Sequence, residues 1–175
     1  MIARAVLAAL CGTAALAPQS TQPASLQGVW RNVERVIPAT TAPGDRVDPF
    51  GHVPVGTQKD VQPGLLIFTK QHYSRTTDTS VTPRPSGSYG LPAKPTLEEL
   101  LARWGPFQAN AGRYELSGDT VTLRPMVSKE PTDQTAGSFA RLLVKLEGDM
   151  LSLTPIENSR GRIAAGVTSR YVRVE

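Results

Sequence analysis

Apolar and polar residues alternate in short runs over most of this chain, which is the pattern of β-strands rather than helices. From Leu26 onward the first run has a period of two, with Gly28, Trp30 and Val36 at the same parity. Residues 65–68 (Leu-Leu-Ile-Phe) are an unbroken apolar run, typical of a fully buried strand. Residues 73–77 are rich in β-forming side chains and can pair back across a turn near residues 70–72.

Two similar segments, residues 116–125 and 146–155, predict two consecutive hairpins. In each segment a leucine precedes a Gly-Asp pair, an alternating run follows, and a proline ends it. Glycine adopts positive φ freely and aspartate can bond its own backbone, which suits a tight turn. Two hairpins in succession indicate antiparallel, up-and-down connectivity.

One segment, residues 96–104, has the pattern of a helix. Thr96 can cap its N-terminus and Glu99 can return a hydrogen bond to the cap, and Gly105 and Pro106 then end it. A spacing of i, i+3, i+4 and i+7 places four apolar residues on one stripe. These are Leu97, Leu100, Leu101 and Trp104. We expect this helix to cover part of a sheet or to close one end of a barrel.

Two proline-rich stretches, residues 37–62 and 78–95, lack periodicity and are expected to be long loops whose role the sequence leaves open. Short strands, tight turns and one helix together predict a mainly β domain. Its expected architecture is an antiparallel up-and-down β-barrel of about eight strands, with one short α-helix.

The first residues resemble a signal peptide. Residues 1–17 contain an early positive charge at Arg4, an apolar stretch and then small residues. We therefore expect export to the periplasm or the medium, with residues 18–25 as a linker and residues 26–175 as the barrel domain. Cys11 is the one cysteine, so the mature protein would have no disulfide, and no later stretch is long enough for stable membrane insertion.

Composition excludes several other classes of protein. Fifteen glycines and fifteen prolines among 175 residues exclude a coiled coil or a long helical bundle. The net charge of +4 is spread along the chain, and no run of Lys and Arg is dense enough to indicate nucleic-acid binding. His52 and His72 are the two histidines, which disfavours a metal site. The sequence contains neither the Gly-x-Ser-x-Gly motif of a nucleophile elbow nor a phosphate-binding loop, so no cofactor is expected. The sequence leaves the oligomeric state open.

The segment Leu26-Gln-Gly-Val-Trp-Arg31 resembles the first strand of the lipocalins, and more closely that of the bacterial lipocalin-like domain. Further segments that resemble this family follow in the same order. They are residues 63–69, 72–74, 107–115, 118–122, 141, 148–153 and 170–173. The sequence departs from the family in having Tyr171 where Trp is common, and in having no histidine in residues 120–124. The resemblance implies a closed barrel and, more loosely, an apolar ligand.

Four residues are expected to close the barrel. The ring of Trp30 can be buried at one end, and Gly28 allows a neighbouring segment to approach closely. A guanidinium of the last strand, from Arg170 or Arg173, can stack on that ring. Such a contact would join the first and last strands and remove both sheet edges.

A second group of residues is expected near a ligand pocket. If the helix closes the mouth of the barrel, aromatic rings can line the pocket and polar tips can orient a ligand. Asn32 and Glu34 share the parity of Trp30 and would then face the interior. The candidate ligand-binding residues are Asn32, Glu34, Phe68, Tyr73, Arg75, Trp104, Phe107 and Tyr114.

The leading hypothesis for function is a carrier or binding protein for a small hydrophobic molecule. The alternative is an enzyme of isomerase or cyclase type acting on a hydrophobic substrate, for which Glu34 and His72 are the candidate acids or bases. A further alternative is a structural or interaction domain whose barrel is filled by its own side chains.

Overall fold

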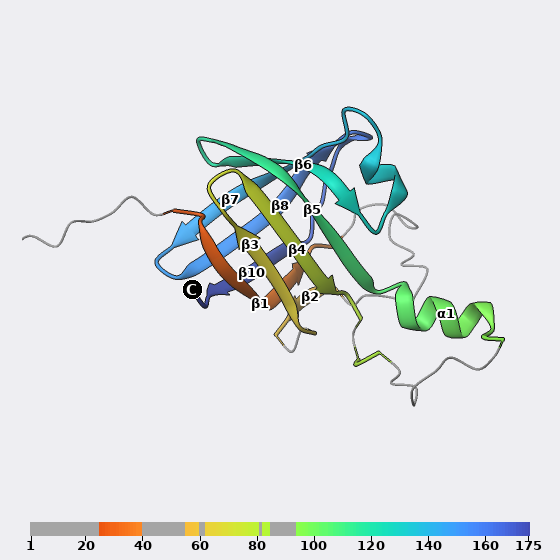
Figure 1. Cartoon of the computed structure of the whole chain (residues 1–175). Coiled ribbons are helices and arrows are strands. Elements are labelled where there is room, and N and C mark those ends of the chain that lie inside the picture. The colour runs from red at the N-terminus through yellow and green to blue at the C-terminus, as the bar shows by residue number, and fades with distance from the viewer. Residues whose placement is uncertain (1–24, 40–54, 60–61, 81, 85–93) are drawn as a thin grey trace, which may run out of the picture.

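The alternating segments form the strands of one antiparallel sheet in the computed structural model (Figure 1). The structure describes residues 25–39, 55–59, 62–80, 82–84 and 94–175. The signal peptide predicted for residues 1–17, nearly all of the linker, and His52 lie outside these residues, as do parts of both predicted loops. The described strands are β1 (Gly28–Ile37), β2 (Gly56–Gln58), β3 (Gly64–Phe68), β4 (His72–Asp78), β5 (Phe107–Ser117), β6 (Thr120–Ser128), β7 (Ala140–Glu147), β8 (Met150–Asn158), β9 (Gly161–Arg162) and β10 (Thr168–Arg173).

Eight of these strands close into a barrel, which confirms the predicted architecture. The strands follow the order β10-β1-β3-β4-β5-β6-β7-β8 around the ring, and β10 pairs back with β8. Tyr171 of β10 therefore lies opposite Asn32 of β1 on one side and opposite Leu151 of β8 on the other. The short strands β2 and β9 are additions that pair with β1 and β8.

The two repeated segments form the predicted hairpins. In the hairpin of β5 and β6, the pair next to the turn is Ser117 and Thr120. In the hairpin of β7 and β8, it is Glu147 and Met150. Both turns place a glycine, Gly118 or Gly148, at a φ of +58°. Residues that carry a side chain rarely adopt this backbone conformation, so glycine at this position allows the tight turn.

Side chains of alternate residues fill part of the interior of the barrel. Burial alternates along β3 and β8, as expected for strands with one face toward a core. The core consists of Leu26, Trp30, Leu66, Phe68, Tyr73, Val121, Leu123, Leu142, Leu151, Leu153 and Tyr171.

A bulge in β1 corrects the expected parity of Asn32 and Glu34. Asn32 lies opposite Tyr171 and Glu34 opposite Arg170, so Val33 is an extra residue on β1. Tyr171 is buried, and its neighbour Arg170 therefore faces outward. Residues directly opposite each other share a face, so Asn32 faces the interior and Glu34 the exterior.

The predicted helix, α1 (Leu97–Trp104), is present with its capping box. Thr96 Oγ1 accepts from the Glu99 backbone N–H, and Glu99 Oε2 accepts from the Thr96 N–H at 2.8 Å. At its other end, the Lys129 ammonium donates to the carbonyl oxygens of Trp104, Gly105 and Phe107. These contacts attach the C-terminal end of α1 near the start of β5.

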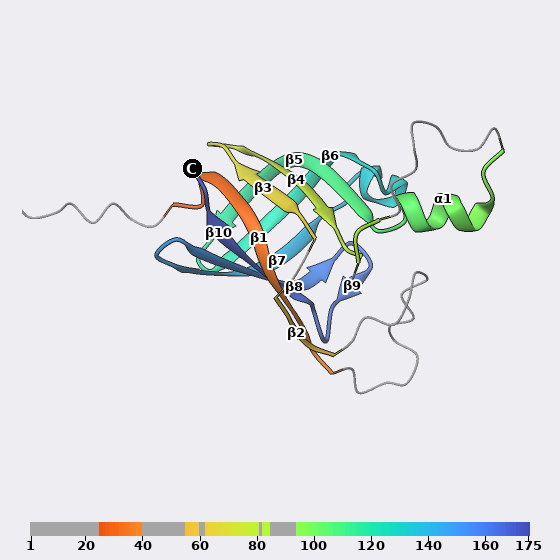
Figure 2. The same cartoon turned by 90° about the horizontal axis from the view of Figure 1, so that it is seen from below.

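The expectation that the helix covers the sheet or closes the barrel is wrong. α1 extends away from the barrel beyond the start of β5 (Figures 1 and 2), and none of its residues is buried. Leu97 is 71% exposed and Trp104 is 51% exposed. The strands close on themselves and bury their inner faces without a helix, so closure of the barrel does not require α1.

Candidate functional site

The base of the barrel is closed by Trp30, which is completely buried. Its indole N–H donates to the Leu26 carbonyl oxygen at 2.8 Å, and the Arg173 guanidinium lies 4.1 Å from the ring centroid. Arg173 also donates to the carbonyl oxygens of Gln27 and Ser25, at 2.6 and 2.7 Å. Of the two arginines considered for this contact, Arg173 therefore stacks on the indole.

Two further residues explain how this end is assembled. Gly28 has a φ of +135°, and a Cβ there would lie 2.4 Å from the Glu175 carbonyl oxygen. Glycine thus lets the last residues cross the first strand, as its place in the sequence suggests. Arg170 instead donates to the Glu34 carboxylate at 2.6 Å on the outer wall.

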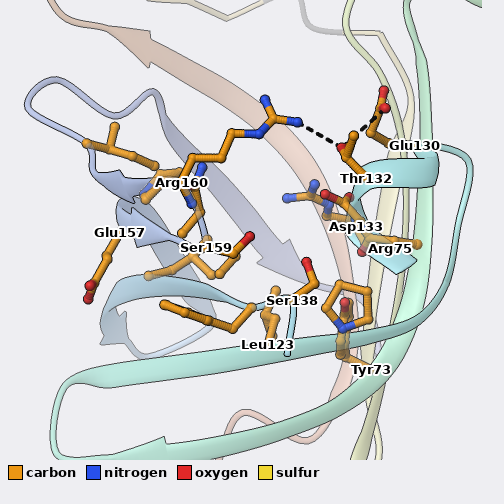
Figure 3. A pocket seen from close by; sticks show the side chains of 18 residues that line it. Tyr73, Arg75, Leu123, Glu130, Thr132, Asp133, Ser138, Glu157, Ser159 and Arg160 are labelled. Carbon is orange, nitrogen blue, oxygen red and sulfur yellow. Dashed lines mark hydrogen bonds between the residues drawn. The ribbon is translucent and has the colours of Figure 1, made fainter. Parts of the chain in front are cut away.

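A cavity of about 360 Å³ lies inside the barrel beyond this packed base (Figure 3). Strands β4 to β8 contribute to its walls, together with the β6–β7 connection and the turn after β8. The β6–β7 connection includes a 3-10 helix, η1 (Pro131–Gln134). The β6–β7 connection and the β7–β8 turn lie at opposite ends of the barrel. The β7–β8 turn is at the Trp30 end, because the carboxylate of Asp149 in this turn is 3.6 Å from Arg173 Nε. The cavity is therefore on the far side of the core from Trp30.

The walls of the cavity combine apolar and polar side chains. The apolar ones come mainly from β6, β7 and β8 and from the segments that connect them. They are Leu123, Pro125, Phe139, Ala140, Leu142, Pro155 and Ile163. The polar ones on the opposite wall include Tyr73 and Arg75 of β4 and Asn110 of β5. A concave pocket that combines apolar side chains with polar groups able to orient a ligand is typical of a small-molecule site.

The polar wall contains three buried atoms that have no hydrogen-bond partner among the described residues. They are Tyr73 Oη, Arg75 Nε and Asn110 Oδ1. The register brings them together, because Arg75 lies opposite Leu66 on β3 and opposite Asn110 on β5. Leu66 is fully buried, so all three side chains share its inward face. Buried polar atoms are usually paired, and a cluster of unpaired ones costs free energy unless something else binds there.

Tyr73 is held in its neutral form at ordinary pH. Burial raises the pKa of its phenol from 10.0 to about 12; the Arg75 charge lowers the pKa and the Asp133 charge raises it by smaller amounts. The hydroxyl is therefore a hydrogen-bond donor at neutral pH and a poor general base.

The carboxylates that line the cavity have other partners. Asp133 Oδ2 accepts from the Ser128 hydroxyl at 3.1 Å, Glu157 pairs with Arg141 at 2.7 Å, and Glu130 accepts from Thr132 at 3.3 Å. Arg160 reaches from the turn after β8 to Thr132 Oγ1 at 2.8 Å, and a dashed line joins these two labelled residues in Figure 3. By contrast, no hydrogen bond or ion pair of Arg75 is present in the described part of the chain.

The structure brings only part of the candidate ligand group together. Tyr73 and Arg75 line the cavity, whereas Asn32 is buried but is not among the lining residues and donates to the Arg170 carbonyl oxygen at 3.0 Å. Phe68 and Tyr114 pack against each other with ring centroids 4.8 Å apart, and Tyr114 Oη donates to the Thr69 carbonyl oxygen at 2.8 Å. These two rings belong to the packed core near the β3–β4 turn rather than to the cavity walls.

The other three ligand candidates and His72 lie away from the cavity. Trp104 is on the exposed helix, and Phe107 lies under the Arg84 guanidinium at 5.3 Å. Glu34 is on the outer wall, and His72 is exposed, opposite Arg113. Neither residue nominated for acid–base chemistry is therefore among those that line the cavity.

Several lining residues were not found from the sequence. Asn110 could have been found, because it stands at the same parity as Gly112 and Tyr114 on a strand expected to pair with residues 73–77. Asp133, Ser138 and Arg160 belong to connections without periodicity, and no signal in the chain places them at the cavity.

Metal and membrane sites were also considered. No group of three or more metal-ligating side chains is present among the residues that the structure describes. Within the same residues, no helix has the length and apolarity needed to cross a membrane.

Comparison with known proteins adds no assignment: no protein-family model matches the chain, and no curated protein matches it.

Proposed function

We propose that this protein binds a small, largely apolar molecule in the barrel cavity and acts as a carrier or binding protein. The observation that carries this proposal is the division of the barrel interior. One end is packed around Trp30, and the other contains a cavity of about 360 Å³ whose lining is about half apolar. This volume falls within the range of about 300–1,000 Å³ typical of ligand pockets.

Two expectations from the sequence accompany the proposal. The first is membership of the lipocalin-like group that the sequence resembles, which would imply an apolar ligand inside a closed barrel. The leader-like segment, residues 1–17, supports a location outside the cytoplasm.

The test is to fill the cavity and measure binding of a neutral, apolar fluorophore such as aminoanthracene. Ala140 lines the cavity from β7, so Ala140→Trp would occupy much of its volume. Leu143 is 42% exposed on the same strand, and Leu143→Trp is the matched control. We expect Ala140→Trp to weaken binding by about tenfold or more, and the control to bind as the unmodified protein does.

Thermal unfolding of both variants shows whether each one is folded. Equal binding by the two folded variants would mean that the dye sits on the surface and would contradict the proposal. Native mass spectrometry of the purified protein gives a second measurement, because a retained ligand appears as a fixed added mass that Ala140→Trp removes.

A further inference from the structure

We infer that the molecule bound in the cavity is a compact carboxylic acid, whose carboxylate is held by Arg75 and Tyr73 while its apolar part lies against Leu123 and Leu142. This inference rests on the proposed function and specifies the ligand of the same cavity. The observation behind it is the side chain of Arg75, which lines the cavity with a buried Nε that has no hydrogen-bond partner and with no ion pair among the described residues.

The first step of the argument concerns charge. Arg75 carries a guanidinium group, and a cation that is partly withdrawn from water is costly unless it is paired. Its Nε is buried and has no partner, and no carboxylate within the described residues forms an ion pair with it. Glu157 and Asp133, which line the same cavity, are already bonded to Arg141 and Ser128. A ligand that carries a negative charge would supply the missing partner.

The second step concerns the shape of the polar wall. Tyr73 and Arg75 are two residues apart on β4, so both side chains point inward from neighbouring positions on one face. Tyr73 is 3% exposed, and its hydroxyl has no partner. A guanidinium fork beside a phenol O–H is a set of donors that matches the two oxygens of a carboxylate. Asn110 lies opposite Arg75 and can add a third donor for the ligand carboxylate. Rotation of its side-chain amide by 180° exchanges the oxygen and the NH₂ group without changing the shape of the side chain.

The third step distinguishes a carboxylate from a more highly charged head group. Three carboxylates, from Glu130, Asp133 and Glu157, also line the cavity. A ligand with a single negative charge is neutralised by Arg75, whereas a phosphate monoester would bring a second charge toward these acidic side chains. The geometry therefore favours a monoanion with an apolar body.

The test compares two probes that differ only in the head group, octanoate and octanol, by isothermal titration calorimetry at neutral pH. We expect octanoate to bind at least about tenfold more tightly than octanol, because its carboxylate can accept charge-assisted hydrogen bonds from Arg75 that the octanol hydroxyl cannot match. Arg75→Met should abolish this preference and leave octanol binding unchanged. Arg113→Met is the matched control, since Arg113 is exposed on the outer face of β5 and should preserve the preference.

Two milder variants keep the test decisive if Arg75→Met does not fold. Tyr73→Phe removes one donor, and Arg75→Lys keeps the charge but loses the fork, so each should weaken octanoate binding several-fold and leave octanol unaffected. If octanoate and octanol bind equally well to the unmodified protein, the carboxylate inference is wrong and the proposed function stands. If neither probe binds and aminoanthracene does not bind either, both proposals are wrong.

Discussion

At the scale of single residues, two arginines of the last strand have different roles although they are three positions apart. Arg173 stacks on the buried indole of Trp30 and donates to two carbonyl oxygens, and its side chain is 25% exposed. Arg170 forms an ion pair with Glu34 on the outer wall, and its side chain is 46% exposed. Contacts at a buried ring contribute more to stability than an exposed ion pair does.

This difference predicts unequal effects of truncation. Arg173→Ala should lower the free energy of unfolding by about 2–4 kcal/mol, because it removes the cation–π contact and two hydrogen bonds of a charged donor. Arg170→Ala should lower it by no more than about 1 kcal/mol. Urea denaturation of both variants measures these changes, and equal losses would contradict the assignment of Arg173 to the closure of the barrel base.

The buried phenol of Tyr73 predicts a dependence of stability on alkaline pH. Its pKa is about 12 in the folded protein, whereas the unfolded chain has the ordinary value of 10.0. Between these values the unfolded state releases the proton and the folded state keeps it, so stability is greatest below pH 10 and falls as the pH rises toward 12. We expect the unmodified protein to lose about 2 kcal/mol more than Tyr73→Phe over this interval. Parallel denaturation curves for the two proteins would show that the phenol does not have this raised pKa.

At the scale of elements, α1 forms by local rules and contributes little to the core. Its capping box and its C-terminal contacts with Lys129 are local or peripheral, and its apolar stripe remains largely uncovered. Most helical stability in proteins comes from packing of such a stripe, so this helix is an exception that the cap supports.

The exposed stripe leads to a prediction about the helix. Leu97→Gln and Leu101→Gln should each change the free energy of unfolding by less than about 0.5 kcal/mol, because surface substitutions lose little burial. Leu153→Ala, at a position that is 3% exposed in the barrel, should cost about 2–5 kcal/mol. A loss above about 1 kcal/mol in either helix variant would indicate that α1 packs on the barrel in solution.

At the scale of the whole molecule, β10 completes the ring because it pairs with both β1 and β8. A closed barrel has no unpaired edge, so the first and last strands are as well protected as any other. β2 and β9 lie off the ring and pair with only one strand each.

Closure can be tested by amide hydrogen exchange. We expect the paired amides of β10 and β1 to exchange only through global unfolding, at the same free energy as those of β5 and β6. Amides of β2 and β9 should exchange faster, through local opening. Fast exchange along β10 would show that the barrel opens between β10 and β8, and it would remove the closed ring that shapes the cavity on which both proposals depend.

Much of this architecture was predictable from the sequence, because the signals involved are local. The Gly-Asp turns, the Thr96–Glu99 capping box and the alternation along β3 and β8 each depend on residues a few positions apart. Such features follow from backbone conformation and the two-residue period of a strand. They were sufficient to indicate antiparallel strands and the two hairpins, whereas closure into a barrel was implied by the resemblance to the lipocalin-like domain.

The site depended on arrangements between distant residues, which only the tertiary structure decided. A single extra residue, Val33, turns Glu34 outward to meet Arg170, which is 136 positions away. Closure of the strands leaves α1 outside, and the register of β3, β4 and β5 gathers Tyr73, Arg75 and Asn110 on one wall. The physical reason is that a shift of one residue reverses the face of every following side chain, and pairing across the barrel sets that shift.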